Sequence, residues 1–275
     1  MPVADLPGTQ IYYEVSGPEA GPPLLLIHGL GAQIAMWDPG LIALVEQAGF
    51  RVIQFDNRDV GLSATVEGDY ELSDMAADAR DLVDHLGLDR VHVAGQSMGG
   101  MIAQQVAISY PETVLSLTSI YSAPSRAYIT ADPEAREKRQ QGPAASYDEA
   151  VEQFIDRETV SGLDGIDDAA IRAYAEKVIS RDYKREASHH GRTAHTRATM
   201  GAPDRTEGLT KLAIPAAVIH GRADPLVSFE GGIATARAIP DADLHIFAGM
   251  KHQLRRDLWP DYIRIITRTA QRARD

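Results

Sequence analysis

The 275-residue sequence contains no cysteine, which excludes disulfide bonds, thiolate metal sites and a cysteine nucleophile. It has no apolar run long enough to span a membrane, and its first residues do not resemble a secretion signal. Basic residues are also scarce, because 27 lysines and arginines face 39 aspartates and glutamates, giving a formal net charge of −12. Such a chain lacks the basic surface that nucleic acids require. We therefore expect a cytoplasmic protein that binds neither membranes nor nucleic acids.

The hydrophobic fraction of 44% is ample for a core, and short apolar segments alternate with helical patterns along much of the chain. This alternation predicts a parallel β-sheet flanked by helices. Ser73 resembles the N-cap of a helix over 74–86, and Gly87 resembles its stop signal. The strands expected are an edge strand at 11–15, buried strands at 24–27 and 213–223, and further strands at 51–55, 90–94, 116–121 and 244–247.

The most informative stretch is Gly95-Gln96-Ser97-Met98-Gly99, which lies between a strand pattern at 90–94 and a helical pattern at 100–108. A strand, G-x-S-x-G and a helix form a nucleophile elbow, in which a sharp turn lifts the serine hydroxyl clear of the sheet. The turn crowds the positions two residues away on either side, and glycine removes the side chains that would clash there. The pattern therefore predicts that Ser97 is a nucleophile.

A serine hydroxyl is a weak nucleophile at neutral pH, so Ser97 needs a base and a carboxylate that orients that base. Asp224 directly follows the strand at 213–223, and His252 lies in the loop after the strand at 244–247. Both positions suit these roles, because loops at the ends of parallel strands meet at one edge of the sheet. The histidines within helices or strands are interpreted as structural residues; these are His85, His92, His220 and His245.

The elbow and the chain order Ser97, Asp224, His252 resemble the α/β-hydrolase superfamily over residues 11–268. The resemblance implies an α/β-hydrolase fold, with a mostly parallel central sheet flanked by helices and a helical cap insertion. The turn at 55–63 and the ending 249–260 are similar to those of aclacinomycin-type methylesterases, and enol-lactonases and cofactor-free haloperoxidases share most of these features. Haloalkane dehalogenases and epoxide hydrolases are excluded, because they carry an aspartate at the position of Ser97.

The resemblance also assigns an oxyanion hole and a pocket. The segment His28-Gly29 resembles the oxyanion loop of the family, so the backbone N–H groups of Leu30 and Met98 are the expected donors. Candidate walls of the substrate pocket are the apolar residues whose segments converge near the nucleophile, namely Trp37, Tyr121, Leu226 and Phe229. Their character favours a small, largely apolar substrate.

Between about residues 125 and 208 the rhythm of strands and helices stops, and helical patterns occur at 146–160, 167–179 and 185–200. The resemblance places the helical cap here, which leaves 1–124 and 209–275 as the α/β core domain. The role of the cap histidines His189, His190 and His195 stays open, although no clustered ligand set supports a metal.

Together these features predict a serine hydrolase that cleaves a carboxylic ester or lactone through an acyl-enzyme. The alternatives are perhydrolase or haloperoxidase-type activity, carbon–carbon bond hydrolysis at the same triad, and a non-catalytic ligand-binding member of the fold. No G-x-G-x-x-G follows the first strand, so no nucleotide cofactor is expected. The sequence has no clustered set of metal ligands either, so no metal is expected. A homodimer remains possible, and the sequence does not choose the substrate.

Overall fold

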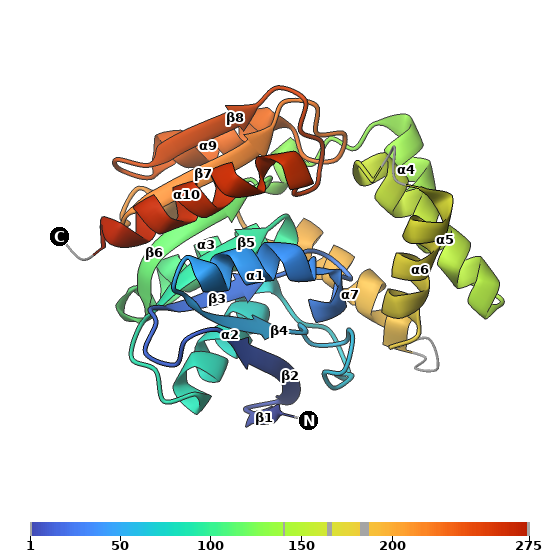
Figure 1. Ribbon diagram of the computed structural model, residues 1–275, viewed down its shortest axis with the longest axis horizontal. Coiled ribbons are helices and arrows are strands. Elements are labelled where there is room, and N and C mark those ends of the chain that lie inside the picture. Colours follow the sequence, from blue (N-terminus) through green and yellow to red (C-terminus); the bar gives the residue numbers. More distant parts are fainter. Residues whose placement is uncertain (1, 140, 164–166, 182–186, 274–275) are drawn as a thin grey trace.

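An eight-stranded sheet forms the centre of the protein in the computed structural model, which describes residues 2–139, 141–163, 167–181 and 187–273, with the backbone alone at 187–189 (Figure 1). The strand order is β1-β2-β4-β3-β5-β6-β7-β8. β4, β3, β5, β6, β7 and β8 pair in parallel, while β1 and β2 join one edge antiparallel. The strands are β1 (Val3–Leu6), β2 (Thr9–Ser16), β3 (Pro23–Ile27), β4 (Arg51–Phe55), β5 (Val91–Gln96), β6 (Val114–Ile120), β7 (Ala216–Gly221) and β8 (Asp243–Phe247).

The mostly parallel sheet agrees with the predicted fold class, but the prediction of an edge strand at 11–15 was wrong. That segment lies in β2, which pairs with β4 on one side and with β1 on the other. β1 occupies the edge and has only four residues, in register from Val3 with Tyr12 to Leu6 with Thr9. A segment this short carries no readable alternation, so its pairing depends on the hairpin that brings it back to β2.

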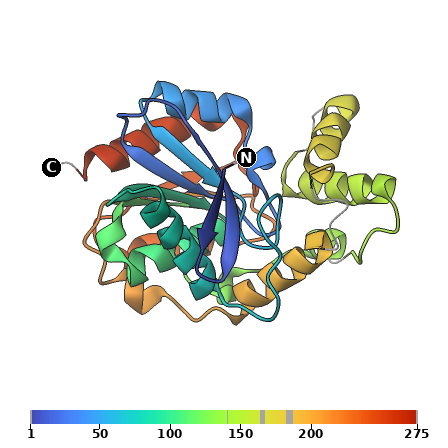
Figure 2. The ribbon, with the colours of Figure 1, turned by 90° about the horizontal axis from the view of Figure 1, so that it is seen from below.

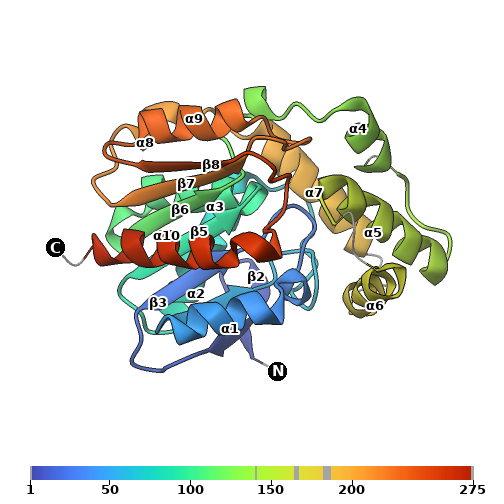
Figure 3. The same ribbon diagram turned by 45° about the horizontal axis from the view of Figure 1, so that its top comes forward.

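Helices cover both faces of the sheet, as the views in Figures 2 and 3 show. On one face, α1 (Pro39–Gln47) packs beside α10 (Trp259–Gln271). On the other face lie α2 (Leu72–His85), α3 (Met98–Ser109), the short α8 (Thr206–Leu209) and α9 (Phe229–Ala238). Both faces are therefore shielded from water, which explains why the central strands are apolar runs without alternation.

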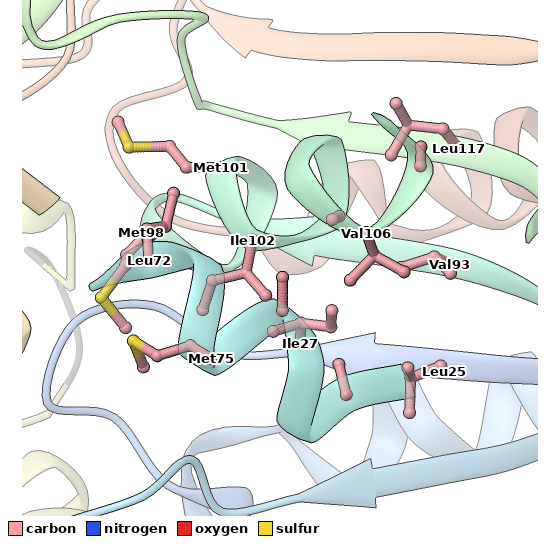
Figure 4. Close-up of a cluster of buried hydrophobic side chains, with 14 of the residues drawn as sticks. Leu25, Ile27, Leu72, Met75, Val93, Met98, Met101, Ile102, Val106 and Leu117 are labelled. Carbon is pink, nitrogen blue, oxygen red and sulfur yellow. The ribbon is translucent and has the colours of Figure 1, made fainter. Parts of the chain in front are cut away.

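The largest part of the core lies between α2, α3 and the sheet (Figure 4). Ile102 and Val106 of α3 are at most 1% exposed and point between α2 and the strands, where Leu25, Ile27 and Val93 meet them. Burying each such side chain stabilises the fold by about 1.5–3 kcal/mol. This packing fixes α3, and with it the elbow at its first residue.

Helix α2 begins earlier than the sequence pattern predicted. Its first residue is Leu72 and its N-cap is Glu71, whose N–H donates to Asp74 Oδ2 at 2.7 Å. The expectation that Ser73 is the N-cap was therefore wrong, because the carboxylate of Asp74 accepts the backbone N–H of Glu71, two positions before Ser73. The stop signal was right, since Gly87 adopts a positive φ of 65° just past the helix.

After β6 the alternation of strands and helices stops, and it resumes at β7. Besides the short α8, the interval holds four helices, which we call the cap helices: α4 (Pro133–Arg139), α5 (Tyr147–Ser161), α6 (Asp168–Ile179) and α7 (Ala187–Gly201). They stand to one side of the sheet in Figures 1 and 3. α5 and α6 pack through a small core of their own, made by Val151, Phe154, Ala175 and Val178. Across the part of the chain that the structure describes, no helix has the length and apolarity needed to cross a membrane.

Candidate active site

Ser97 lies in the turn between β5 and α3 and has the backbone angles φ 57° and ψ −123°, which side-chain-bearing residues rarely adopt. Glycines make this turn possible. A Cβ on Gly95 would lie 2.0 Å from the Gly99 carbonyl oxygen, and a Cβ on Gly99 would lie 2.2 Å from the Ile27 carbonyl oxygen. The strain is held by the packing of α3, so the Ser97 hydroxyl projects beyond the carboxyl end of β5.

The structure brings the three predicted residues together. His252 Nε2 lies 2.8 Å from Ser97 Oγ, and His252 Nδ1 lies 2.7 Å from Asp224 Oδ2. Because an ionised carboxylate only accepts hydrogen bonds, Nδ1 carries the proton and donates it to Asp224. Nε2 is then the acceptor that faces the serine hydroxyl. The histidine side chain is 5% exposed and the aspartate side chain is fully buried.

The Asp224 carboxylate is held as an anion by several partners. Oδ1 accepts the N–H groups of Leu226 at 2.8 Å and Val227 at 3.0 Å, while His220 Nε2 lies 3.4 Å from Oδ2. Burial alone would raise the pKa of Asp224, but His252, His220 and the Val227 N–H more than offset it and hold this pKa well below its usual range. His220, interpreted from the sequence as a structural residue, thus lies beside the carboxylate.

The loop after β3 lies directly against the nucleophile, as an oxyanion loop must. A Cβ on Gly29 would lie 3.2 Å from the Ser97 Cβ. Within the described residues, the N–H groups of Leu30 and Met98 donate no hydrogen bond to another protein group. Met98 is moreover the first residue of α3, where the helix dipole is positive. Both predicted donors are thus placed to serve an incoming oxyanion.

His195 of α7 fixes the same loop from the cap side, a role that the sequence did not indicate. Its Nδ1 accepts the N–H of Gly31 at 3.0 Å, and its Nε2 donates to the Arg58 carbonyl oxygen at 2.9 Å. The side chain is fully buried, and this burial lowers the pKa of His195 to about 4, so the ring is neutral at pH 7. His190 is exposed, and the side chain of His189 lies outside the described residues.

A polar network lines the floor beneath the triad. Tyr121 donates its hydroxyl to Gln96 Oε1, and Gln96 Nε2 lies 3.0 Å from the nearer His28 ring nitrogen. Burial lowers the pKa of His28 to about 3, so this ring is neutral. The Tyr121 ring also packs on His252, with the ring centroids 4.6 Å apart. Only the aromatic character of Tyr121 was apparent from the sequence; its contact with the histidine depends on the positive φ of 33° at the end of β6.

Ser97 and His252 open into a cavity of about 770 Å³ between the core and the cap helices. Trp37 and Tyr121 line it, in agreement with the prediction. Leu226 and Phe229 do not line it, so their assignment as pocket walls was wrong. Leu226 packs into the main hydrophobic core beneath the Asp224 loop, and Phe229 begins α9 on the outer face of the sheet.

The cavity is lined by apolar side chains, here called the apolar wall, and by charged side chains, so the expectation of a largely apolar substrate fits only part of it. Core and cap residues give the apolar wall, which consists of Met36, Trp37, Leu41, Leu163, Ile171, Leu254 and Trp259. Charged side chains from the cap, Arg139 and Glu158, face the same space. No group of histidines, aspartates and glutamates suited to hold a metal ion occurs among the described residues.

Comparisons with known proteins agree with this geometry. A family model described as alpha/beta hydrolase fold matches residues 22–254. RutD of Variovorax paradoxus, a protein named for carbamate hydrolysis, is 40% identical over 111 residues, 40% of this chain and 41% of that protein. The match thus spans about two fifths of its length. A non-heme haloperoxidase of Rhodococcus erythropolis is 28% identical over 89% of this chain and 90% of its own.

Among solved structures, the enol-lactonase of Burkholderia xenovorans superimposes with a TM-score of 0.78. The two chains are 21% identical, and the match covers 98% of this chain and 100% of the other. This likeness shows a common fold.

Proposed function

Because the chain belongs to the alpha/beta hydrolase fold family and is a hydrolase of that fold, we propose that it is a serine hydrolase that cleaves a carboxylic ester or lactone. The observation that carries the proposal is the continuous chain of hydrogen bonds from Asp224 through His252 to a strained Ser97. These bonds end in a cavity that can hold a small molecule. Ester and lactone carbonyls are the electrophiles that such a serine attacks.

In the proposed reaction, Ser97 Oγ attacks the carbonyl carbon while its proton passes to His252 Nε2. Asp224 keeps the ring oriented and stabilises the imidazolium that forms. The tetrahedral intermediate places its oxyanion between the N–H groups of Leu30 and Met98, which have no other acceptor in the described protein. Collapse expels the alcohol, which takes the proton from His252, and leaves an acyl-enzyme. Water then repeats the cycle and releases the acid.

The electrostatics favour this sequence of steps. The low pKa of Asp224 keeps a negative charge next to the imidazolium throughout the cycle. Each backbone donor of the oxyanion hole contributes about 3 kcal/mol to the transition state in comparable enzymes. Burial lowers the pKa of His28 to about 3 and the pKa of His195 to about 4, so both rings are weak bases and neither takes up the serine proton.

The experiment that tests this function is intact-mass measurement after incubation with a fluorophosphonate, on the wild type and on Ser97→Ala in parallel. A single adduct on the wild type only is the expected result, because the reagent requires an activated serine and a formed oxyanion hole. Equal thermal unfolding of the two proteins would show that the variant is folded. An unmodified wild type would overturn the proposal and favour a ligand-binding member of the fold.

Carbamate hydrolysis is a second candidate, favoured by the 40% identity to the Variovorax paradoxus protein over part of the chain. A carbamate carbonyl would be attacked by Ser97 in the same way, so the geometry accepts both substrates. The values of kcat/KM for matched 4-nitrophenyl esters and carbamates decide between them. Replacing water by hydrogen peroxide in the ester assay tests perhydrolysis, an activity that the haloperoxidase relative suggests.

A further inference from the structure

Three arginines and one carboxylate of the cap interact electrostatically, and one of these arginines lines the cavity together with the carboxylate. Arg139 comes from α4, Arg157 from α5 and Arg192 from α7, and the carboxylate is Glu158. Each arginine is half-buried. Burial lowers the pKa of Arg192, and the positive charges of Arg157 and Arg139 lower it further. The negative charge of Glu158 acts in the opposite direction on the pKa of all three arginines.

These arginines have few partners within the protein. Arg139 donates to Ser161 Oγ at 3.3 Å, and the Arg157 guanidinium lies 6.0 Å from the centre of the Phe154 ring. Within the described residues, none of the three forms an ion pair, and the side chains of Arg157 and Arg192 donate no hydrogen bond. Since arginine stays protonated in proteins, the three guanidinium ions outnumber the two described cap carboxylates that act on them, Glu158 and Asp156, and Asp156 also lies 3.8 Å from Lys138.

Two other arginines that line the cavity are paired with carboxylates. On the core side, Arg255 pairs with Asp257 at 2.6 Å and Arg256 pairs with Asp38 at 2.9 Å. These cations are thus neutralised by neighbours. Unlike these two rim arginines, Arg139 lines the cavity without an ion pair among the described residues.

The arginine cluster is joined to the reaction centre at two points. Arg139 and Glu158 line the same cavity as Ser97 and His252. The carbonyl oxygen of Gly162, at the end of α5, accepts a hydrogen bond from Gln253, the residue after His252. A ligand held by the cap would therefore lie within the space that opens on the serine.

The second junction is the oxyanion loop. The Arg192 side chain packs on Gly31, where an added Cβ would lie 2.7 Å from its Cγ and 2.8 Å from its Nη1. Glycine at this position, with a φ of 68°, is what lets the arginine approach. Gly31 directly follows Leu30, so the guanidinium of Arg192 lies beside the expected oxyanion donor.

We propose that Arg139, Arg157 and Arg192 form an anion subsite, and that the substrate is an ester or lactone carrying a carboxylate. The carboxylate supplies the counter-charge that the cap lacks, and the planar guanidinium groups can bind it through paired hydrogen bonds. The reactive carbonyl then faces Ser97, with its alkyl part along the apolar wall. This inference rests on the proposed hydrolase function and names its substrate class.

The test uses two esters that differ at one end only. 4-Nitrophenyl pentanoate ends in a methyl group, and the 4-nitrophenyl monoester of glutaric acid ends in a carboxylate on a chain of equal length. Because a hydrogen bond to a charged group contributes about 1.5–3 kcal/mol, we expect kcat/KM for the glutarate ester to exceed that for the pentanoate by roughly 10-fold or more. The rates are corrected for spontaneous hydrolysis of each ester.

Variants then show which side chains cause the preference for the glutarate ester. Arg139→Gln and Arg192→Gln should each lower the ratio of the two kcat/KM values by about 10-fold, and Glu158→Gln should raise it because a repulsive carboxylate is lost. Arg172→Gln is the matched control, since Arg172 lies in the cap but is 45% exposed and pairs with Glu152. Turnover of the pentanoate ester shows in each case that the variant is folded.

The outcomes separate the two proposals. A ratio near one in the wild type that no variant changes would refute the anion subsite, while turnover of both esters would leave the hydrolase function standing. If neither ester is cleaved and the fluorophosphonate does not react, the hydrolase function fails. Equilibrium binding of glutarate to Ser97→Ala then decides the subsite alone: binding that Arg192→Gln weakens supports it, and no binding refutes it.

Discussion

Arginines in the core and in the cap of this protein differ in whether a carboxylate pairs with them. In the core, Arg58 makes two 2.7 Å contacts with the carboxylate of Asp78 and lies over the ring of Tyr70. In the cap, Arg157 and Arg192 have no such counter-ion among the described residues. A pair that the fold itself completes contributes to structure, whereas an arginine without an ion pair beside a cavity is suited to receive a ligand.

The catalytic residues and the cap side of the cavity differ in the same respect, namely whether protein groups alone stabilise their charges. The Asp224 carboxylate is held by two backbone N–H groups and two histidines, so its charge and position do not depend on a substrate. The unpaired arginines of the cap, in contrast, would need a ligand to supply a counter-charge. We infer that the chemistry is built into the core and that substrate selection is assigned to the cap.

The largest effect is expected where the core fixes the base. Asp224→Asn should lower kcat by about 10⁴-fold, because a neutral amide no longer holds the His252 Nδ1 proton in place. The fold should persist, since the shape of the side chain is retained. Single-turnover assays with a chromogenic ester would measure the loss. A decrease of only a few-fold would show that another carboxylate orients His252.

The next largest effect tests the paired cation of the core. Arg58→Met leaves the Asp78 carboxylate buried without its partner, which should cost about 3–5 kcal/mol of unfolding free energy. Denaturant unfolding measures the change, and Arg172→Met in the cap, whose ion pair is exposed, is the matched control. Equal losses in the two variants would contradict the distinction between built-in and exposed pairs.

The sequence predicted the parts of the site that local patterns encode. Ser97, Asp224 and His252 could be found because each follows a readable strand and sits in a turn with a recognisable motif. Leu226 and Phe229 were placed wrongly, because closeness in sequence to Asp224 does not tell which way a side chain points. At both positions the fold turns the chain away from the cavity, toward the core and the outer helix layer.

The charged wall could not be predicted for a different reason. Arg139 lies in a segment rich in charges that resembles a solvated helix, and Arg192 lies in a helix with a polar sequence. Only tertiary packing brings these helices together over one cavity. His195 was equally hidden, since a single histidine in a polar helix carries no sign that it binds a loop 164 residues away.

His195 gives a smaller test of how the cap supports the core. His195→Phe removes the acceptor for the Gly31 N–H and the donor to the Arg58 carbonyl oxygen, and each buried group left without a partner costs about 1–3 kcal/mol. We expect lower stability and a reduced kcat, because the oxyanion loop loses its support. Thr196→Phe, at an exposed position of the same helix, should change stability by less than about 0.5 kcal/mol. Similar losses in both variants would assign the effect to α7 as a whole.

The smallest effect is the pH dependence that His195 imparts. Its pKa is about 4 in the folded protein and 6.5 in the unfolded chain, so protonation favours unfolding as the pH falls below 6.5. Between pH 7 and pH 5 this should remove roughly 2 kcal/mol of stability from the wild type and none from His195→Phe. Contributions from other groups, such as Asp56 and Asp78 with their pKa values raised by burial, cancel in the comparison. The stability gap between the two proteins should therefore narrow on acidification. A gap that stays constant from pH 7 to pH 5 would mean that His195 is not held neutral, and that the cap supports the oxyanion loop by packing alone.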